Sequence, residues 1–339
     1  MTINIAINGF GRIGRLAFRV IAERKQKDLN TKLNVVAIND QVNTEYLAYL
    51  LKYDSIHGRF SGAVEFDDQY LVVNGNRIRA LNIVSPADAP WSELGVDVVI
   101  ESTGLFTTVE KASAHIEAGA KQVVISAPSP DAPMYVMGVN DQHYDSGQQI
   151  VSNASCTTNC LAPLVKIIHD NWGIEEGLMT AVHAATASQR AVDSAARSDW
   201  RGGRSVGGNI IPASTGAANA VAKVIPELAG KLTGMAFRVP TTDVSVVDLT
   251  VRTQRRTCLR EIVSAVQKSA AGAMQGVIAV TEDPVVSSDF IHDSHSSILD
   301  ANACIELNPR FFKLVSWYDN EWGYANRLVE LSEMIAGKK

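Results

Sequence analysis

The sequence has few cysteines, little excess charge and no long apolar run, and each shortage excludes a class of protein. Four cysteines in 339 residues are too few for a disulfide scaffold and indicate reduced thiols in a reducing compartment. A formal net charge of −5 provides no basic surface for nucleic acid. The apolar runs are too short to span a membrane, and the first residues lack the regions of a signal peptide. We therefore expect a cytoplasmic protein with no membrane partner and no nucleic acid as its primary partner.

Metal ligands, internal repeats and low-complexity tracts are also missing. Two thiols near the centre, Cys156 and Cys160, are too few to hold a metal ion, and no nearby His or Cys cluster completes a set. We therefore expect no metal. The length predicts one large or two medium domains, and 46% apolar with 20% charged residues is ordinary for a globular chain.

The most informative stretch that is present runs Ser155-Cys156-Thr157-Thr158-Asn159-Cys160, and apolar residues recur behind it at helical spacing. We expect Cys156 at a helix N-terminus, with Ser155 or a neighbour as the cap. Unpaired backbone N–H groups and the helix dipole lower the pKa of a thiol there. A nucleophile and a buried, inert cysteine both stay open here, because free cysteines are usually buried but polar neighbours flank this sulfur. Cys160, one turn later, is either a resolving thiol or a core residue.

A glycine fingerprint opens the chain. The β-prone run 3–7 leads into Asn8-Gly9-Phe10-Gly11-Arg12-Ile13-Gly14, and helix formers follow. In such a strand–turn–helix the glycines permit a tight turn, close approach to a pyrophosphate and close packing of helix on strand. A second apolar strand, 33–38, ends at Asn39-Asp40. An acidic residue there binds ribose hydroxyls and repels a 2′-phosphate, so Asp40 favours NAD over NADP.

The remaining pattern predicts two kinds of sheet. Strands at 98–100 and 122–126, with a crossover helix at 109–118, complete a doubly wound parallel sheet of the Rossmann type. The second half predicts an α+β catalytic domain with a mixed, largely antiparallel sheet. Its strands are expected at 178–182, 235–237, 242–252, 277–280, 287–291 and 311–317, and its helices at 258–271 and 321–336. We expect an NAD-binding domain over 1–155, completed by a C-terminal helix at 320–339, and a catalytic domain over 156–319.

Chemistry-bearing residues recur in the second half. His183 ends a predicted strand and is a candidate base for the reactive cysteine. Two groups suit an anion: Ser214-Thr215-Gly216 before a helical run, and Arg238 at the end of a strand. The glycine-rich stretch 193–209 is too long for one element and predicts an ordered functional loop.

These motifs resemble phosphorylating glyceraldehyde-3-phosphate dehydrogenase over essentially the whole chain. The resemblance is carried by residues 7–15, by 155–163 (Ser-Cys-Thr-Thr-Asn-Cys-Leu-Ala-Pro), by 214–218 and by 317–324 (Trp-Tyr-Asp-Asn-Glu-Trp-Gly-Tyr). It implies oxidation of D-glyceraldehyde 3-phosphate with inorganic phosphate to 1,3-bisphosphoglycerate, in glycolysis or gluconeogenesis. It also implies a homotetramer, in which the loop from about 184 to 208 reaches a neighbouring subunit's cofactor.

The resemblance also implies residue roles. Cys156 would form a thiohemiacetal and then a thioester, with His183 as base. The positions that match substrate or phosphate sites are Ser155, Thr157, Thr186, Arg201, Thr215, Gly216 and Arg238. The positions that match the cofactor site are Asn8, Gly9, Phe10, Gly11, Arg12, Ile13, Gly14, Asp40, Arg79, Thr103, Gly104, Ser126, Asn320 and Tyr324.

Several positions depart from the family pattern. Asn219 stands where a lysine is common, Ser188 where a threonine is usual, and Gln41, Ser194 and Ala195 at positions that accompany cofactor choice. NAD is the expected cofactor and use of NADP stays open, as does a specialised, inhibitor-tolerant isozyme. The alternatives in function are erythrose-4-phosphate dehydrogenase, a phosphate-independent aldehyde dehydrogenase on the same fold, and a binding role.

Overall fold

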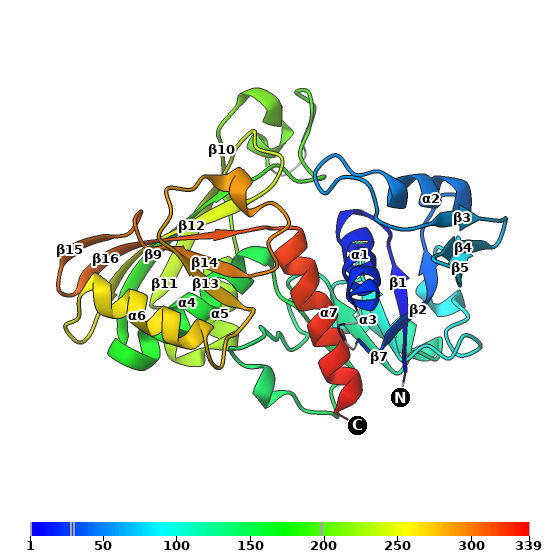
Figure 1. Cartoon of the computed structure of the whole chain (residues 1–339), viewed down its shortest axis with the longest axis horizontal. Coiled ribbons are helices and arrows are strands. Elements are labelled where there is room, and N and C mark those ends of the chain that lie inside the picture. The colour runs from blue at the N-terminus through cyan, green and yellow to red at the C-terminus, as the bar shows by residue number, and fades with distance from the viewer. Residues whose placement is uncertain (1, 28, 30, 197–198, 339) are drawn as a thin grey trace. The chain divides into compact units, whose positions relative to one another are not determined.

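The computed structural model describes residues 2–27, 29, 31–196 and 199–338. The chain divides into two units, one of residues 1–135, 143–154 and 325–339 and the other of residues 136–142 and 155–324. Each unit is built on its own sheet, and Figure 1 labels the elements. Among the described residues, no helix combines the length and the apolar character needed to cross a membrane.

The first unit contains a parallel sheet extended by a short antiparallel edge. Its elements are β1 (Ile3–Asn8), α1 (Arg12–Gln26), β2 (Leu33–Asn39), α2 (Thr44–Lys52), β3 (Val64–Phe66), β4 (Tyr70–Val73), β5 (Asn76–Leu81), β6 (Val98–Glu101), α3 (Val109–Glu117), β7 (Gln122–Ile125) and β8 (Ile150–Ser152). The strand order is β3-β4-β5-β2-β1-β6-β7-β8. In this spatial order, every neighbouring pair from β5 through β2, β1, β6 and β7 to β8 is parallel. The predicted Rossmann-type sheet is confirmed, whereas the β3–β4–β5 edge was not predicted.

Apolar side chains bury both faces of this sheet. All four residues of β6 and of β7 are buried, as expected for central parallel strands covered on both sides. The last helix, α7 (Trp322–Gly337), contributes its residues from Ala325 onward to this unit. Arg24 of α1 donates to Asn326 and Glu330 of α7, which ties the two helices together.

The second unit holds a mixed sheet. Its elements are α4 (Cys156–Trp172), β9 (Ile174–His183), β10 (Ile211–Ser214), α5 (Ala217–Val224), β11 (Leu232–Arg238), β12 (Ser245–Thr253), α6 (Leu259–Ala270), β13 (Ile278–Thr281), β14 (Ser297–Asp300), β15 (Ile305–Asn308) and β16 (Phe311–Tyr318). The order is β10-β11-β9-β12-β16-β14-β13, with β15 paired to β16. Pairing is antiparallel except for β9 with β11 and β13 with β14, which confirms the predicted mixed, largely antiparallel sheet.

One face of this sheet is buried, and the other is only partly buried. Alternate residues of β12 and β16 are buried, and α4 packs on these strands (Figure 1). On the opposite face, half-buried Val182, Val246 and Phe237 stand side by side in register. The second unit therefore presents a partly apolar sheet face.

The strand predicted at 287–291 is wrong, because residues Ser287–Phe290 form a 3₁₀ turn. The carboxylate of Asp289 accepts a hydrogen bond from the backbone N–H of Val286, which closes the turn. Phe290 then packs in a small apolar cluster with Val244 and Ile298. The buried Phe290 therefore belongs to a turn and not to a strand.

The loop predicted at 193–209 is present as two short 3₁₀ turns, Arg201–Gly203 and Val206–Gly208. The carboxylate of Asp193 organises it by accepting from Arg204 Nε and from the backbone N–H of Ser205, at 2.8 Å each. Residues 197 and 198, which belong to this predicted loop, lie outside the described residues.

Candidate active site

Cys156 is the first residue of α4, and Ser155 is the helix cap. The Ser155 hydroxyl accepts from the backbone N–H of Thr158 at 3.0 Å, which confirms the predicted helix start. Ala154, just before the cap, has a φ of 55°, in the left-handed region where alanine is uncommon. A constrained turn therefore delivers the half-buried Cys156 to the end of the helix.

His183 lies beside this sulfur. It is the last residue of β9, and its Nε2 is 3.5 Å from Cys156 Sγ. Burial, and next the charge of Arg238, lower the pKa of His183 to about 4, so the imidazole is neutral near pH 7. A neutral imidazole at this distance can accept the thiol proton.

The thiol itself does not follow the expectation from its helix position. Burial raises the pKa of Cys156, and it outweighs the Thr157 hydroxyl and the Arg238 charge, which act in the opposite direction. The predicted lowering is therefore wrong for this state of the protein. The cysteine needs a base, and the structure supplies one.

Tyr318 is a further site residue, and it was not predicted individually. Its hydroxyl lies 2.9 Å from Thr157 Oγ1, and its ring meets the His183 ring edge-on at 6.1 Å. Burial raises the pKa of Tyr318 well above its usual range, so the phenol stays protonated. Its place in the Trp-Tyr-Asp-Asn-Glu motif was the available signal.

Arg238 also reaches the pair, through sheet register. Parallel pairing of β9 with β11 sets Arg238 directly beside His183, and Arg238 Nη1 lies 2.7 Å from His183 Nδ1. Thr186, three residues past the end of β9, places its hydroxyl 3.1 Å from that of Ser188. The predicted substrate-phosphate residues therefore follow or flank the catalytic strand.

The remaining predicted anion residues make contacts of their own. Thr215 Oγ1 accepts from the backbone N–H of Ala217 at 3.2 Å, and Gly216 is the N-cap of α5. Arg201 is exposed at the start of a 3₁₀ turn, and its backbone N–H donates to Asp199. Because Gly216 has no side chain, the start of α5 is open to an anion.

A cavity of about 360 Å³ lies at the carboxyl ends of β1, β2 and β6 in the first unit. Predicted cofactor residues that line it are Asn8, Gly9, Gly11, Asp40 and Thr103. Gln41, which stands at a position that accompanies cofactor choice, also lines it. The unpredicted lining residues are Asn39, Ile83, Val84, Ser102, Leu105 and Phe106. The carboxyl edge of a parallel sheet is where such folds bind dinucleotides.

The glycine turn fits a dinucleotide on steric grounds. A Cβ at Gly14 would lie 2.1 Å from the carbonyl oxygen of Gly9, so α1 packs against β1 only because residue 14 is glycine. A Cβ at Gly11 would meet no atom within 4 Å and would instead occupy space beside the cavity. Asp40 accepts from the backbone N–H groups of Phe10 and Gln41 at 2.7 Å each, which fixes its carboxylate at the turn.

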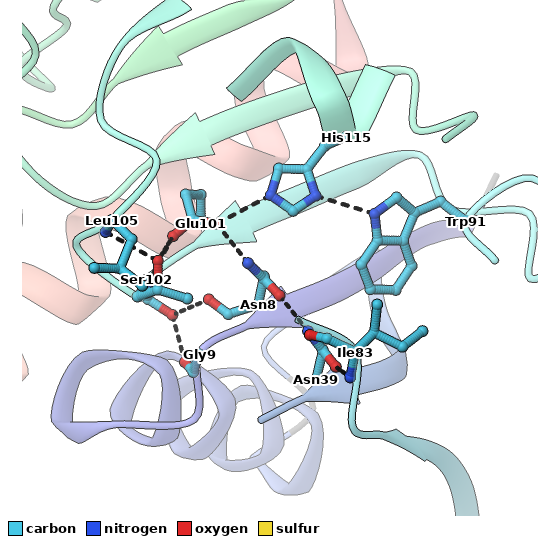
Figure 2. Close-up of polar contacts among 10 residues, drawn as sticks. Asn8, Gly9, Asn39, Ile83, Trp91, Glu101, Ser102, Leu105 and His115 are labelled. Atoms are coloured by element: carbon cyan, nitrogen blue, oxygen red, sulfur yellow. Dashed lines mark hydrogen bonds and ion pairs between the residues drawn. The ribbon is translucent and has the colours of Figure 1, made fainter. Parts of the chain in front are cut away.

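Figure 2 shows a buried polar chain that supports this cavity. Glu101, 1% exposed, accepts from Asn8 Nδ2 at 2.6 Å and from the backbone N–H of Thr103 at 2.8 Å. His115 Nε2 lies 3.0 Å from the same carboxylate, and His115 Nδ1 lies 3.0 Å from Trp91 Nε1. Because an indole N–H can only donate, His115 Nδ1 accepts and His115 Nε2–H donates to Glu101.

The same chain continues to the cavity wall. Asn39 donates to Asn8 Oδ1 at 2.7 Å and to the carbonyl of Ile83 at 2.8 Å, and the N–H of Ile83 donates back to Asn39. Because the Glu101 carboxylate accepts from the amide nitrogen of Asn8, the amide oxygen of Asn8 is left to accept from Asn39. The carboxylate thus orders the hydrogen bonds at the ends of three strands. In the sequence, the available signal for this chain is a glutamate directly after the apolar strand 98–100.

Other predicted cofactor residues have partners in the protein itself. The Arg12 guanidinium pairs with Asp54 at 2.5 Å, and Arg79 donates to Gln69 at 2.6 Å. Asn320, in the second unit, accepts from the Ser245 hydroxyl at 2.6 Å. Among the remaining predicted residues, Phe10 is buried against Phe18, and Ile13 is in the first turn of α1. Gly104 has a φ of 75°, and the backbone N–H of Ser126 donates to the carbonyl oxygen of Glu101. Tyr324 is buried in the second unit.

Comparison with known proteins agrees with these features. A family model for the glyceraldehyde 3-phosphate dehydrogenase NAD binding domain matches residues 3–109, and one for the C-terminal domain of the same family matches residues 155–320. Glyceraldehyde-3-phosphate dehydrogenase 1 of Schizosaccharomyces pombe is 59% identical over 98% of both chains. Glyceraldehyde-3-phosphate dehydrogenase 2 of Saccharomyces cerevisiae is 57% identical over 98% of this chain and 99% of its own. Glyceraldehyde-3-phosphate dehydrogenase 1 of Caenorhabditis elegans is 58% identical over 98% of both.

The dinucleotide fold and these matches define an NAD-dependent oxidoreductase of the phosphorylating aldehyde dehydrogenase type. Within that class, the chain belongs to the glyceraldehyde-3-phosphate dehydrogenase family. The alternative functions considered from the sequence are not favoured by the comparisons.

Proposed function

We propose that the protein converts D-glyceraldehyde 3-phosphate, inorganic phosphate and NAD to 1,3-bisphosphoglycerate and NADH. The observation that carries this proposal is the Cys156–His183 pair at 3.5 Å with Arg238 beside it. A thiol with an adjacent neutral base is the arrangement of a covalent catalyst, and a guanidinium there suits a substrate phosphate.

The proposed chemistry follows from this pair. His183 Nε2 takes the thiol proton, the sulfur attacks the aldehyde carbon, and the protonated Nε2 gives its proton to the aldehyde oxygen, so that a thiohemiacetal forms and Nε2 is again free to accept a proton. NAD, when bound, accepts the hydride. His183 Nε2 takes the hydroxyl proton of the thiohemiacetal, which becomes a thioester. A phosphate oxygen then attacks the acyl carbon, the C–S bond breaks, and the Cys156 thiolate leaves with an acyl phosphate as product.

The family resemblance supports the roles that we assign to the other residues. Backbone N–H groups at the start of α4, with Ser155 and Thr157, stabilise the oxyanion and the attacking phosphate. Arg238 and Thr186 hold the substrate phosphate, and Arg201, Thr215 and Gly216 contribute to the second anion site. The residues lining the cavity at Asp40 hold the cofactor, with Asn320 and Tyr324 at the nicotinamide.

The test is formation of NADH, followed by absorbance, with and without inorganic phosphate and with NADP in parallel. We expect phosphate-dependent activity with NAD and a loss of about 10³-fold or more for Cys156→Ser. Cys160→Ser is the matched control, because the Cys160 sulfur is buried against Ser297 and Ser316 and its pKa is raised to about 12. Activity that ignores phosphate, or that survives Cys156→Ser, would contradict the proposal.

We further propose that the protein is a cytoplasmic homotetramer. Four free cysteines support a reducing compartment. The partly apolar face of the second sheet supports self-association, as do two exposed apolar side chains, Leu178 at 63% and Trp200 at 83%. Trp200 lies on the loop that the family resemblance directs to a neighbouring subunit.

A further inference from the structure

Ser245 is a buried serine that contacts two segments of the second unit at once. It is the first residue of β12 and is 1% exposed. Its hydroxyl oxygen accepts from the backbone N–H of Ala184, the residue after His183, at 3.0 Å. The same hydroxyl donates to Asn320 Oδ1 at 2.6 Å. Ser245 therefore connects the end of β9 with the residue that we assign to the nicotinamide.

The neighbours of Ser245 determine where its single proton lies. A serine hydroxyl has one O–H to donate and two lone pairs that accept. The backbone N–H of Ala184 can only donate, so it occupies a lone pair. The Tyr318 hydroxyl, which is also close to Ser245, is engaged by Thr157 Oγ1 at 2.9 Å. The proton of Ser245 is therefore directed to Asn320 Oδ1.

This hydrogen bond fixes which end of the Asn320 amide meets a ligand. An asparagine side chain has an acceptor oxygen at one end and an NH₂ donor at the other, and a half-turn exchanges them. With Oδ1 held by Ser245, Nδ2 is the end that remains. Asn320 is 5% exposed, and its side chain makes no other hydrogen bond among the described residues. A buried donor held in one direction selects an acceptor, such as the carbonyl oxygen of a carboxamide.

The backbone just before Ser245 gives a second, independent observation. Val244 has a φ of 63°, in the left-handed region that is a genuine outlier for a β-branched residue. Packing in a cluster with Phe290 and Ile298 holds Val244 in place. Such strained residues persist only where the surrounding structure holds them, and they gather at ligand sites. The strained residue sets the point where β12 begins, and with it the position of Ser245 between its two partners.

We propose that Ser245 is a positioning residue for the cofactor, because it holds Asn320 with its N–H toward the carboxamide oxygen of the nicotinamide and ties Asn320 to the backbone beside His183. The inference rests on the proposed function, in which Asn320 lies at the nicotinamide and His183 is the base. Hydride transfer requires the reacting groups to be held in line, and small displacements slow it steeply. One hydroxyl thus links a cofactor ligand to the strand that carries the base.

The main test is a double-mutant cycle on NAD affinity, measured by fluorescence quenching with the full-length protein. We expect Ser245→Ala to weaken NAD binding about fivefold and Asn320→Ala about tenfold. A residue that acts through Asn320 adds nothing once Asn320 is removed, so the double variant should bind NAD as Asn320→Ala does. Ser316→Ala is the matched control and should keep its NAD affinity, because Ser316 is also fully buried but pairs with Ser297 at 2.8 Å.

A second readout needs no cofactor. Crystal structures of the parent protein and of Ser245→Ala, both without ligand, compare the side chain of Asn320. We expect one ordered rotamer in the parent protein, and two rotamers or clearly larger displacement parameters in the variant. Ser245→Cys serves if the alanine variant does not fold, because a thiol is similar in size and a weak donor, and its loss of NAD affinity should be smaller.

The outcomes separate this inference from the proposed function. If the losses of NAD affinity multiply in the double variant, if Ser245→Ala binds NAD normally, or if the Asn320 rotamer stays unchanged, the positioning role is overturned and the function stands. Normal NAD affinity of Asn320→Ala removes Asn320 from the nicotinamide, and the inference with it. A parent protein that forms no NADH in the presence of phosphate is the separate failure of the proposed function.

Discussion

At the catalytic pair, burial acts on the two partners in opposite directions along the pKa scale. It raises the pKa of the Cys156 thiol and lowers that of the His183 imidazole, because each neutral form is favoured away from water. Arg238 lowers both, which opposes burial at the thiol and adds to it at the imidazole. Burial therefore favours the uncharged form of each partner, and the charge of Arg238 opposes that effect only at the thiol.

This pair predicts a pH dependence of stability. The His183 pKa is about 4 in the fold against about 6.5 in an unfolded chain, so the unfolded chain binds the proton first as pH falls. The contribution of the neutral imidazole is complete above pH ~6.5 and is lost as pH falls toward 4. At pH 5 the loss amounts to roughly 2 kcal/mol in the free energy of unfolding.

The measurement is urea unfolding of the protein and of His183→Gln at pH 7 and pH 5. The His183→Gln variant should lose less stability between the two pH values than the parent protein. His143→Gln is the control, because His143 is exposed and should leave the slope as it is. Equal slopes for all three proteins would show that His183 titrates normally.

At the scale of elements, two glycines in the turn from β1 to α1 have different roles. Gly14 allows the helix to approach the strand, since a Cβ would lie 2.1 Å from Gly9 O and 2.8 Å from Ser102 Oγ. Gly11 adjoins open space at the cavity and tolerates a methyl group sterically. One position therefore serves folding and the other serves ligand approach.

A matched pair of alanine substitutions tests this division. Gly14→Ala should lower the free energy of unfolding by about 2 kcal/mol or more, since the helix must move to relieve the overlap. Gly11→Ala should leave unfolding within about 1 kcal/mol but weaken NAD binding about tenfold or more, because its methyl group occupies pyrophosphate space. Urea unfolding and NAD titration by fluorescence quenching measure the two effects. If both variants lost stability and NAD affinity together, the two glycines would not have separate roles.

At the scale of the whole molecule, one face of the second sheet carries half-buried and exposed apolar side chains. Leu178 projects from it, and the register places Leu178 beside Thr250 of β12 and Thr233 of β11. An exposed, partly apolar sheet face is costly in water, and a second copy of the chain would bury it.

Charge on this face should therefore disrupt assembly. We expect Leu178→Asp to elute from a sizing column as a smaller species than the parent protein, with its circular dichroism unchanged. Leu29→Asp is the control, because Leu29 is similarly exposed, at 61%, on the first unit. Unchanged size of the Leu178→Asp protein in sedimentation would exclude this face from the interface.

Local patterns in the sequence determined much of this protein. The glycine spacing, the apolar strands and the capped cysteine helix depend on neighbours within a few residues. They correctly predicted the parallel part of the first sheet, the mixed character of the second sheet and the start of α4. The Ser287–Phe290 turn was missed because it depends on one side-chain hydrogen bond rather than on periodicity.

Tertiary structure decided what depends on distance through space. Strand register set Arg238 beside His183, and folding brought His183 to Cys156. Neither Arg238 nor Cys156 is close to His183 along the chain. The direction of the thiol pKa also required the structure, because burial of the sulfur outweighs the helix terminus that the sequence reveals. Desolvation is set by everything packed around a group, which no local pattern encodes.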